Sequence, residues 1–242
     1  MEYKYALKQN HEDLSSGRVI YHKSGLSTFP VRLASEILMR CVSYLPKDTE
    51  ISLYDPLCGE AYLLTTLGFL HPDLISHIVG SDISSEALVF AEKNLGLLTQ
   101  EGLLNRQEEL QSLVAQFGKD SHKQAIEACD RLSQNLAKQS LSSHLFEADL
   151  LSEAPLENAP FQADILITDV PYGSMVGWTS AVENPIDQLL ANLQVILKPE
   201  SIVAVVSDKS QKVSSPLFQR LKLLKAGKRR IEILKRSDAN RV

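Results

Sequence analysis

The 242-residue chain is 44% apolar and 23% charged, and its net charge of −5 argues mildly against nucleic acid as a partner. It contains no apolar run near the roughly 18 residues of a membrane span and no secretory signal, so we expect a cytoplasmic protein without a membrane partner. Its three cysteines, Cys41, Cys58 and Cys129, lack the spacing of a metal site, so we expect reduced thiols and no metal. We also expect a monomer.

Residues 1–45 are expected to add two strands and a helix ahead of the main fold. Residues 3–9 and 17–23 are the two short predicted strands, which would form a hairpin. Residues 29–45 place apolar side chains at helical spacing behind Pro30, and this pattern predicts an amphipathic helix.

Strands and helices alternate along the rest of the chain. Strands are predicted at residues 50–55, 77–82, 144–149, 163–169, 201–208 and 229–236, and helices at residues 61–70, 85–98, 186–197 and 216–227. Alternation of this kind predicts an α/β fold with a Rossmann-type, doubly wound and mostly parallel sheet. Ligands bind such a sheet at the carboxyl ends of its strands. We expect a single domain over residues 1–242.

Residues 99–140 form an insertion that is longer than a crossover between parallel strands requires. Two apolar stripes at helical spacing predict a pair of helices, joined by a turn at Gly118, a residue that suits a helix C-terminus. The insertion is either a lid that shapes the substrate site or simple padding, and the sequence favours the lid slightly.

The first strand of the series enters a helix through the turn DPLCGEA at residues 55–61. A tight turn of this kind directs backbone amides at a ligand, and Gly59 allows a close approach. The spacing is not G-x-G-x-x-G, so the turn alone is a weak signal. The next strand ends at Asp82, where a doubly wound fold places an acid against a ribose. Asp82 could instead cap the following helix, although Ser84 and Ser85 are available for that.

The charges around this turn favour S-adenosylmethionine over a dinucleotide as the ligand. Glu60 lies where a pyrophosphate would meet the helix, and it would repel that group. S-adenosylmethionine carries an ammonium and a sulfonium, which Asp55 and Glu60 would attract. Asp149, at the end of a later strand, could accept a hydrogen bond from the adenine amino group, although strand-end aspartates often only start turns.

The strand at residues 163–169 ends in TDVPYG, where a structural loop would more often use Asn, Gly or Ser. Asp169 and the carbonyl of Val170 or Pro171 could accept both N–H bonds of a planar amine, and Pro171 would keep the backbone rigid. Tyr172 could stack on a base that is turned out of its helix. A proline turn with a packed tyrosine is the structural alternative.

The segments DPLCGEAYLL, GSDISSEALVFAEKNL and TDVPYG resemble the motifs of Rossmann-type S-adenosylmethionine-dependent amino-methyltransferases. FPVRLASEI, the helical insertion and a late SDKSQK are similar, more specifically, to the avilamycin-resistance rRNA methyltransferase family, AviRa, over about residues 24–236. This resemblance implies methylation of a guanine in 23S large-subunit rRNA and resistance to an orthosomycin antibiotic. The chain departs from the family pattern at Ala61, where glycine is usual, and at Val170, where many relatives have proline.

By position, the resemblance also implies a set of site residues. The cofactor would be bound by Asp55, Cys58 and Gly59 at its methionine end, Asp82 at its ribose and Asp149 at its adenine, with Phe29, Pro30 and Asp169 as further contacts. The target base would be held by Asp169, Pro171 and Tyr172.

The C-terminal part of the chain is basic, with ten Lys or Arg and one Glu in residues 209–236. It could bind RNA phosphates, or it could be a solvated helix and a charged strand. Arg32 could touch a phosphate or form a surface salt bridge. The expected RNA contacts are Arg32, Lys209, Lys212, Lys225, Lys228, Arg229 and Arg230.

Three interpretations remain open at this stage. Methylation of a guanine in rRNA is favoured, at N2, because N1 would need a base to remove its proton. An amino-methyltransferase acting on DNA adenine or on protein glutamine would share the clamp. A protein that binds S-adenosylmethionine or RNA without turnover is the non-catalytic alternative, and only the altered turn at Glu60-Ala61 supports it.

Overall fold

A computed structural model describes residues 1–15, 17–23, 28–47, 49–136, 141–171, 178 and 182–237. Strands β1 to β7 are, in chain order, Ile51–Asp55, Ile75–Asp82, Ser142–Glu147, Ala163–Asp169, Leu197–Asp208, Phe218–Ala226 and Arg229–Arg236. Helices α1 to α6 are Val31–Val42, Tyr62–Leu70, Ser85–Gly96, Gln100–Phe117, Asp120–Ser133 and Pro185–Leu193, and the short 3-10 helices η1 and η2 are Glu12–Leu14 and Gln194–Ile196. None of these helices is both long and apolar enough to cross a bilayer.

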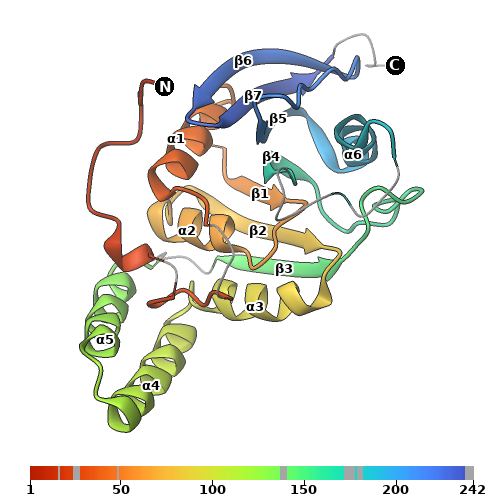
Figure 1. The fold of residues 1–242 in the computed structure, drawn as a ribbon. Coiled ribbons are helices and arrows are strands. Elements are labelled where there is room, and N and C mark those ends of the chain that lie inside the picture. Colours follow the sequence, from red (N-terminus) through yellow and green to blue (C-terminus); the bar gives the residue numbers. More distant parts are fainter. Residues whose placement is uncertain are drawn as a thin grey trace.

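Within the described residues, the strands form one sheet in the order β3-β2-β1-β4-β5-β7-β6 (Figure 1). The strands from β3 to β5 in that order pair in parallel, and β7 and β6 are added antiparallel. Because β1 lies between β2 and β4, the strand order reverses at β1 and β4. These pairings confirm the doubly wound, mostly parallel α/β fold.

Alternate side chains of the central strands point to opposite faces of the sheet. Leu53 of β1 and Ile165 of β4 belong to a core that includes residues of α1, α2 and α3. The adjacent Tyr54 and Leu166 belong to a second core that includes residues of α6. All four side chains are fully buried, which explains why these strands are apolar on both faces in the sequence.

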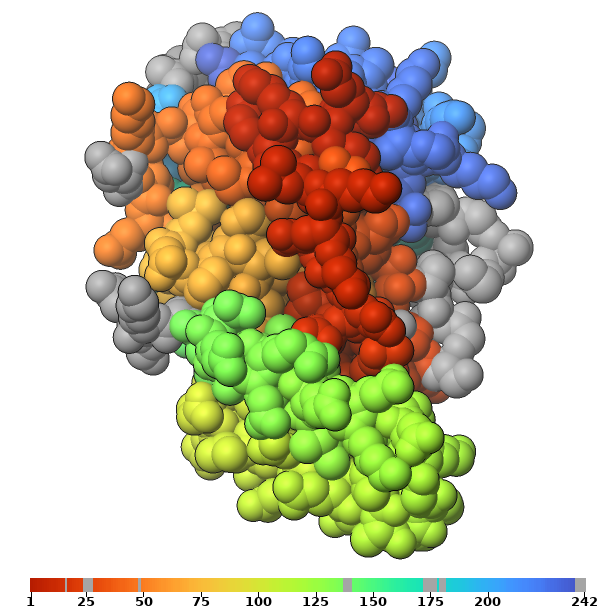
Figure 2. Space-filling model, turned by 90° about the vertical axis from the view of Figure 1, so that its left-hand side faces the viewer, coloured from red at the N-terminus to blue at the C-terminus, as the bar shows by residue number. Residues whose placement is uncertain are grey.

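Helices α4 and α5 lie in the stretch where the sequence predicts an inserted helical pair. Gly118, between them, has a φ of 62°, the left-handed conformation in which a glycine ends a helix. The pair projects from the body of the molecule (Figure 1). Arg131 of α5 donates two hydrogen bonds of 2.7 Å to Asp13 of η1, and Figure 2 shows the first residues of the chain crossing the surface towards this pair.

The described residues of the N-terminal segment contain no strand, so the predicted hairpin at residues 3–9 and 17–23 is wrong. Helix side chains hold this backbone in place of a neighbouring strand. The buried carboxylate of Glu36 in α1 accepts hydrogen bonds of 2.8 Å from the amides of residues 4–6. It also binds Arg40 at 2.7 Å, so a single acid orders the first residues of the chain.

The second half of the segment is held in the same way. Asn94 of α3 accepts a hydrogen bond of 2.8 Å from the Tyr21 amide and donates one of 3.0 Å to the Tyr21 carbonyl. Arg106 of α4 donates to the carbonyls of residues 18 and 19 at 2.8 and 3.0 Å. Val19 and Ile20 are fully buried, and their burial against helices produced the strand-like pattern in the sequence.

The predicted helix at residues 216–227 is also wrong, because most of this stretch is β6. The pairing of β6 with β7 shifts register between Arg220 and Lys222, which is the mark of a β-bulge. Phe218, Leu221 and Leu224 are three residues apart in the sequence, and that spacing imitates one face of a helix. In the sheet, Phe218 belongs to the second core, whereas Leu221 and Leu224 pack against the first.

We expect Glu36→Ala to lower the free energy of unfolding by about 3 kcal/mol, because three backbone amides and Arg40 lose their acceptor together. Urea unfolding measures the loss, and the amides of residues 4–6 should exchange their hydrogens faster. Glu12→Ala is the matched control, because the Glu12–Arg18 pair is exposed and is expected to contribute less than about 1 kcal/mol. Equal losses in the two variants would contradict this role of Glu36.

Candidate active site at the carboxyl ends of β1, β2 and β4

Three aspartates end neighbouring parallel strands. Asp55 ends β1, Asp82 ends β2 and Asp169 ends β4. Since β1 pairs with both β2 and β4, all three acids lie at one edge of the sheet, where the strand order reverses. Doubly wound folds bind their ligands at this edge.

Asp55 is the most deeply placed of the three acids. Burial raises the pKa of its carboxyl to about 8, and the charges of Asp82 and Asp169 act in the same direction. The Leu57 amide, which donates a hydrogen bond of 3.1 Å, and the Thr168 hydroxyl lower this pKa but do not outweigh burial. Asp55 therefore remains largely protonated at neutral pH until a cation reaches it.

Asp82 is held by the turn that follows β1. Its two carboxylate oxygens accept hydrogen bonds from the Gly59 amide at 2.8 Å and from the Ser84 amide at 2.9 Å. The N-cap of α3 is Ser84, whose hydroxyl accepts from the Ala87 amide at 3.2 Å. The cap thus does not depend on Asp82, and each oxygen of Asp82 has a further lone pair for a ligand.

The turn itself contains two residues with positive φ, Gly59 at 52° and Ala61 at 55°. The left-handed conformation costs an alanine about 1–2 kcal/mol. The methyl group of Ala61 is fully buried, which returns about 0.8 kcal/mol, so alanine is tolerated where the family uses glycine. Glycine remains important at position 59, where a Cβ would meet no atom within 4 Å and would occupy open space beside the acids.

Glu60 faces the N-terminal segment. Its carboxylate lies 2.9 Å from His22 Nδ1 and accepts a hydrogen bond of 3.0 Å from the Lys23 amide. Only 8% of Glu60 is exposed. Glu60, which was expected to repel the pyrophosphate of a dinucleotide and to attract S-adenosylmethionine, therefore has a structural role that sequence reasoning missed.

Cys58 and Asp149, two further residues assigned to the cofactor, lie close to these acids. Cys58 is buried, and burial raises the pKa of its thiol, so it is a neutral side chain and no nucleophile. Its amide donates to the Ser81 carbonyl of β2 at 2.8 Å. Asp149 follows β3 and is exposed, and its carboxylate accepts a hydrogen bond of 3.0 Å from the Leu151 amide. It starts a turn, as the alternative from the sequence had it, at the same edge of the sheet.

The clamp sequence after β4 is braced by the neighbouring strand. Val170 is buried, and its amide donates to the Val206 carbonyl of β5 at 2.9 Å. The Pro171 carbonyl accepts a hydrogen bond of 3.1 Å from the Gln211 side chain. Gln211 lies in the SDKSQK segment but was given no role from the sequence. Its bond engages the Pro171 carbonyl, so the Val170 carbonyl is the better second acceptor. Tyr172 lies outside the described residues.

Arg229, expected to contact RNA, lies inside this site. Its Nε is 3.9 Å from Asp169 Oδ2, and its guanidinium lies 5.3 Å from the centre of the Phe29 ring. Phe29 is buried, whereas the next residue, Pro30, is exposed at the start of α1. The register of the sheet explains the position of Arg229, since it pairs with Asp208 at the carboxyl end of β5.

Two of the other predicted RNA contacts face the protein. Arg32 donates a hydrogen bond of 3.0 Å to the Ala6 carbonyl and stacks on the Tyr3 ring at 3.9 Å. Arg230 is buried and binds Glu232 at 2.6 Å. These contacts argue against a phosphate contact for either arginine, because a guanidinium held by the protein is not presented to a ligand. The remaining predicted contacts, Lys209, Lys212, Lys225 and Lys228, are exposed.

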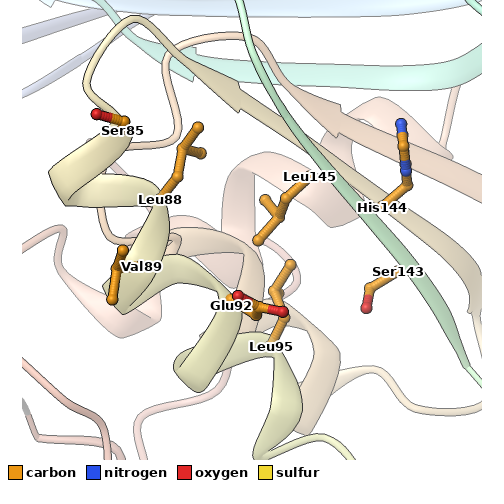
Figure 3. Close-up of a pocket in the computed structure, with 8 residues that line it drawn as sticks. All are labelled: Ser85, Leu88, Val89, Glu92, Leu95, Ser143, His144 and Leu145. Carbon is orange, nitrogen blue, oxygen red and sulfur yellow. The ribbon is translucent and has the colours of Figure 1, made fainter.

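A separate groove of about 380 Å³ runs between α3 and β3 (Figure 3). Its lining includes Leu88, Glu92 and His144, and none of the three strand-end aspartates. We therefore do not assign it to the site.

Comparisons with known proteins match nearly the whole chain. The model of the family described as rRNA methyltransferase AviRa matches residues 1–229. A 23S rRNA (guanine(2535)-N(1))-methyltransferase from Streptomyces viridochromogenes is 34% identical over 245 residues, which cover 98% of this chain and 96% of the relative. A solved structure of the rRNA methyltransferase AviRa from the same organism superposes with a TM-score of 0.86 at 32% identity, over 97% of this chain and 96% of the other.

Because the buried Asp55 carboxyl is protonated in the folded protein, the stability of the protein should depend on pH. In the unfolded chain this carboxyl ionises near pH 4, whereas in the folded protein it ionises at about pH 8. Its contribution to stability is therefore complete below about pH 4 and is lost as the pH rises through about 8.

Asp55→Asn should remove this dependence. At about pH 7.5 we expect the variant to be a few kcal/mol more stable than the parent, with a much smaller difference at about pH 4, by urea unfolding. Asp73→Asn, an exposed acid ahead of β2, should change stability little at either pH. An Asp55→Asn variant that is less stable than the parent at the higher pH would show that the buried acid does not strain the fold.

Proposed function

The chain belongs to the AviRa family of rRNA methyltransferases, and we propose that it transfers a methyl group from S-adenosylmethionine to a guanine base of 23S rRNA. The observation that carries this proposal is the convergence of Asp55, Asp82 and Asp169 at the point where the strand order reverses. The first two acids suit a cationic nucleoside, and the third lies beside them where an acceptor base would enter.

The residues at this edge fit S-adenosylmethionine. The described residues include no cation paired with the buried Asp55 carboxyl, and the cofactor's ammonium would be such a cation. Asp82, oriented by two backbone amides, can accept hydrogen bonds from both ribose hydroxyls. The open space beside Gly59 leaves room for the ligand. When bound, the cofactor supplies a methyl group on a positively charged sulfur.

Family membership decides between the interpretations that the sequence left open. A DNA adenine or protein glutamine substrate loses its support, because the family acts on rRNA. A non-catalytic binding protein loses its support as well, since Glu60 is turned to the N-terminal segment and Ala61 is accommodated.

We place the methyl group on N1 of the guanine, although the clamp sequence favoured N2. The relative that is 34% identical is named for methylation at N1. Asp169 supports this assignment because a carboxylate at the cofactor's reactive end can take the N1 proton, a need that first argued against N1. Protein side chains that hold the base in line with the donor would supply the rest of the rate.

Exposed lysines surround this edge of the sheet and would bind the rRNA backbone. Lys209 and Lys212 follow β5, and Lys225 and Lys228 lie at the turn between β6 and β7. The pairing of Asp208 with Arg229 brings the end of β5 and that turn to the same edge as Asp169. An orthosomycin-resistance role and a cytoplasmic location would follow from modification of the large-subunit rRNA.

The division of labour between the acids can be tested directly. Asp169→Ala should lower kcat for methyl transfer to 23S rRNA at least about 100-fold, because the proton acceptor is removed. Asp82→Ala should weaken the Kd for S-adenosylmethionine more than Asp169→Ala does. Calorimetry and tritium transfer measure the two effects, and Asp73→Ala is the control. Loss of cofactor binding in Asp169→Ala with full activity in Asp82→Ala would overturn the assignment.

RNA binding should depend on the exposed lysines. Lys225→Ala/Lys228→Ala should weaken binding of 23S rRNA fragments and reduce the slope of log Kd against log salt by about 0.7–0.9 for each phosphate that the variant no longer neutralises. Filter binding at several salt concentrations measures the slope. The control is Lys47→Ala/Lys93→Ala, two exposed lysines on the loop before β1 and on α3. An equal change of slope in the control would show that only net charge matters.

A further inference from the structure

Resting on the proposed methylation of guanine N1, we propose that Arg229 is a catalytic residue: it binds O6 of the target guanine and stabilises the negative charge that forms there when N1 loses its proton to Asp169.

Arg229 is placed at the reacting end of the site by three elements. It begins β7 and pairs with Asp208 at the end of β5, the strand beside β4. Its guanidinium lies over the ring of Phe29, which belongs to the segment ahead of α1. Its side chain is 23% exposed and that of Asp169 is 29% exposed, so both open towards the surface from a shared position. A base that reached Asp169 would therefore meet Arg229 as well.

The contacts of Arg229 differ from those of a structural ion pair. Its neighbour Arg230 has such a pair, with a hydrogen bond of 2.6 Å to a Glu232 side chain that is 1% exposed. Arg229 Nε is 3.9 Å from Asp169, which is beyond hydrogen-bond length. In the described part of the chain this Nε is buried and has no hydrogen-bond acceptor. An arginine that is held by a ring face and a distant carboxylate is not committed to a structural ion pair.

Guanine presents the complement of this pair. N1–H is a donor that faces a carboxylate, and O6 beside it is an acceptor that faces a guanidinium, the side chain most often used to bind guanine O6. Removal of the N1 proton leaves an anion whose charge lies largely on O6, and a fixed cation at that atom lowers the barrier.

The step balances without any further reactant. The N1 proton passes to the Asp169 carboxylate, N1 forms a bond to the methyl carbon, and the carbon–sulfur bond breaks with its electron pair going to sulfur. The negative charge on O6 disappears as the C6 carbonyl is restored. Arg229 donates hydrogen bonds throughout and exchanges no proton.

The kinetic test uses Arg229→Gln and Arg229→Lys. Arg229→Gln should lower kcat about 100-fold at neutral pH with a KM for rRNA within about threefold of the parent. The reason is that the lost interaction stabilises mainly the guanine anion that forms when N1 loses its proton. Its defect should shrink as the pH rises, since N1 then ionises without help. Arg229→Lys, which keeps the charge, should recover part of kcat. A defect that is equal at every pH, or one confined to KM, would overturn the proposal.

The control is Arg220→Gln, which removes a cation from the neighbouring strand β6, where Arg220 pairs with Glu232 at 2.9 Å. Its kcat should equal that of the parent. Thermal unfolding and the Kd for S-adenosylmethionine of Arg229→Gln should match the parent. Should Arg229→Gln fail to fold, the partial kcat and the pH dependence of Arg229→Lys decide the question by the same criteria.

A binding measurement without methyl donor tests the contact itself. In an rRNA fragment, the mapped target guanine is replaced by 2-aminopurine, which lacks O6 and the N1 proton. The parent protein should bind the guanine fragment more tightly, and Arg229→Gln should retain only the part of this preference that comes from the N1–H contact to Asp169. A preference for guanine in Arg229→Gln that equals the parent's would refute the contact to O6.

Mapping of the methylated position distinguishes a failure of the role of Arg229 from a failure of the proposed function. N1 methylation by the parent together with an unimpaired Arg229→Gln overturns only the role of Arg229. Methylation at N2, or no transfer to 23S rRNA, overturns the proposed function and this role with it.

Discussion

Crowding of carboxylates at one edge of the sheet is the constraint on which the site depends. Parallel strands end together, so Asp55 lies beside Asp82 and Asp169. Burial, together with the charges of these two acids, keeps Asp55 protonated near neutral pH. Backbone amides relieve part of the repulsion at Asp82, and Arg229 lies near Asp169. The edge remains short of positive charge, so a cationic ligand is bound where the free protein is strained.

The N-terminal segment and the cofactor turn are parts of one arrangement. Glu60 would be an awkward residue beside a phosphate, but its carboxylate is occupied by His22 and Lys23. The Asn94 side chain donates to the Glu60 carbonyl at 2.8 Å and also holds Tyr21. The turn is therefore supported by the N-terminal segment and by α3, and Glu60 takes part in that support.

The sequence predicted what depends on local pattern and on topology. Buried parallel strands, their carboxyl-end acids and the glycine between α4 and α5 have signatures that a short window contains. It failed where long-range contacts replaced a local signal. The N-terminal backbone bonds to the side chains of Glu36, Asn94 and Arg106 far along the chain. The apolar residues of β6 imitate one face of a helix, although they pack in two different cores. Arg229 reaches the site through its pairing with Asp208, and Gln211 reaches it from the turn after β5. No short window of the sequence shows either contact.

The ring position shows why a clamp of acceptors is an incomplete description of this site. Two acceptors alone suit an exocyclic amine, and that argument pointed to N2. A donor beside Asp169 changes the preference, because an acceptor and a donor side by side match N1–H and O6 of guanine. Adenine presents an acceptor at N1 and a donor at N6, so the same pair would oppose carboxylate to lone pair and guanidinium to amine. Arg229 would thus exclude adenine as well as assist guanine, and selectivity and catalysis would share one contact.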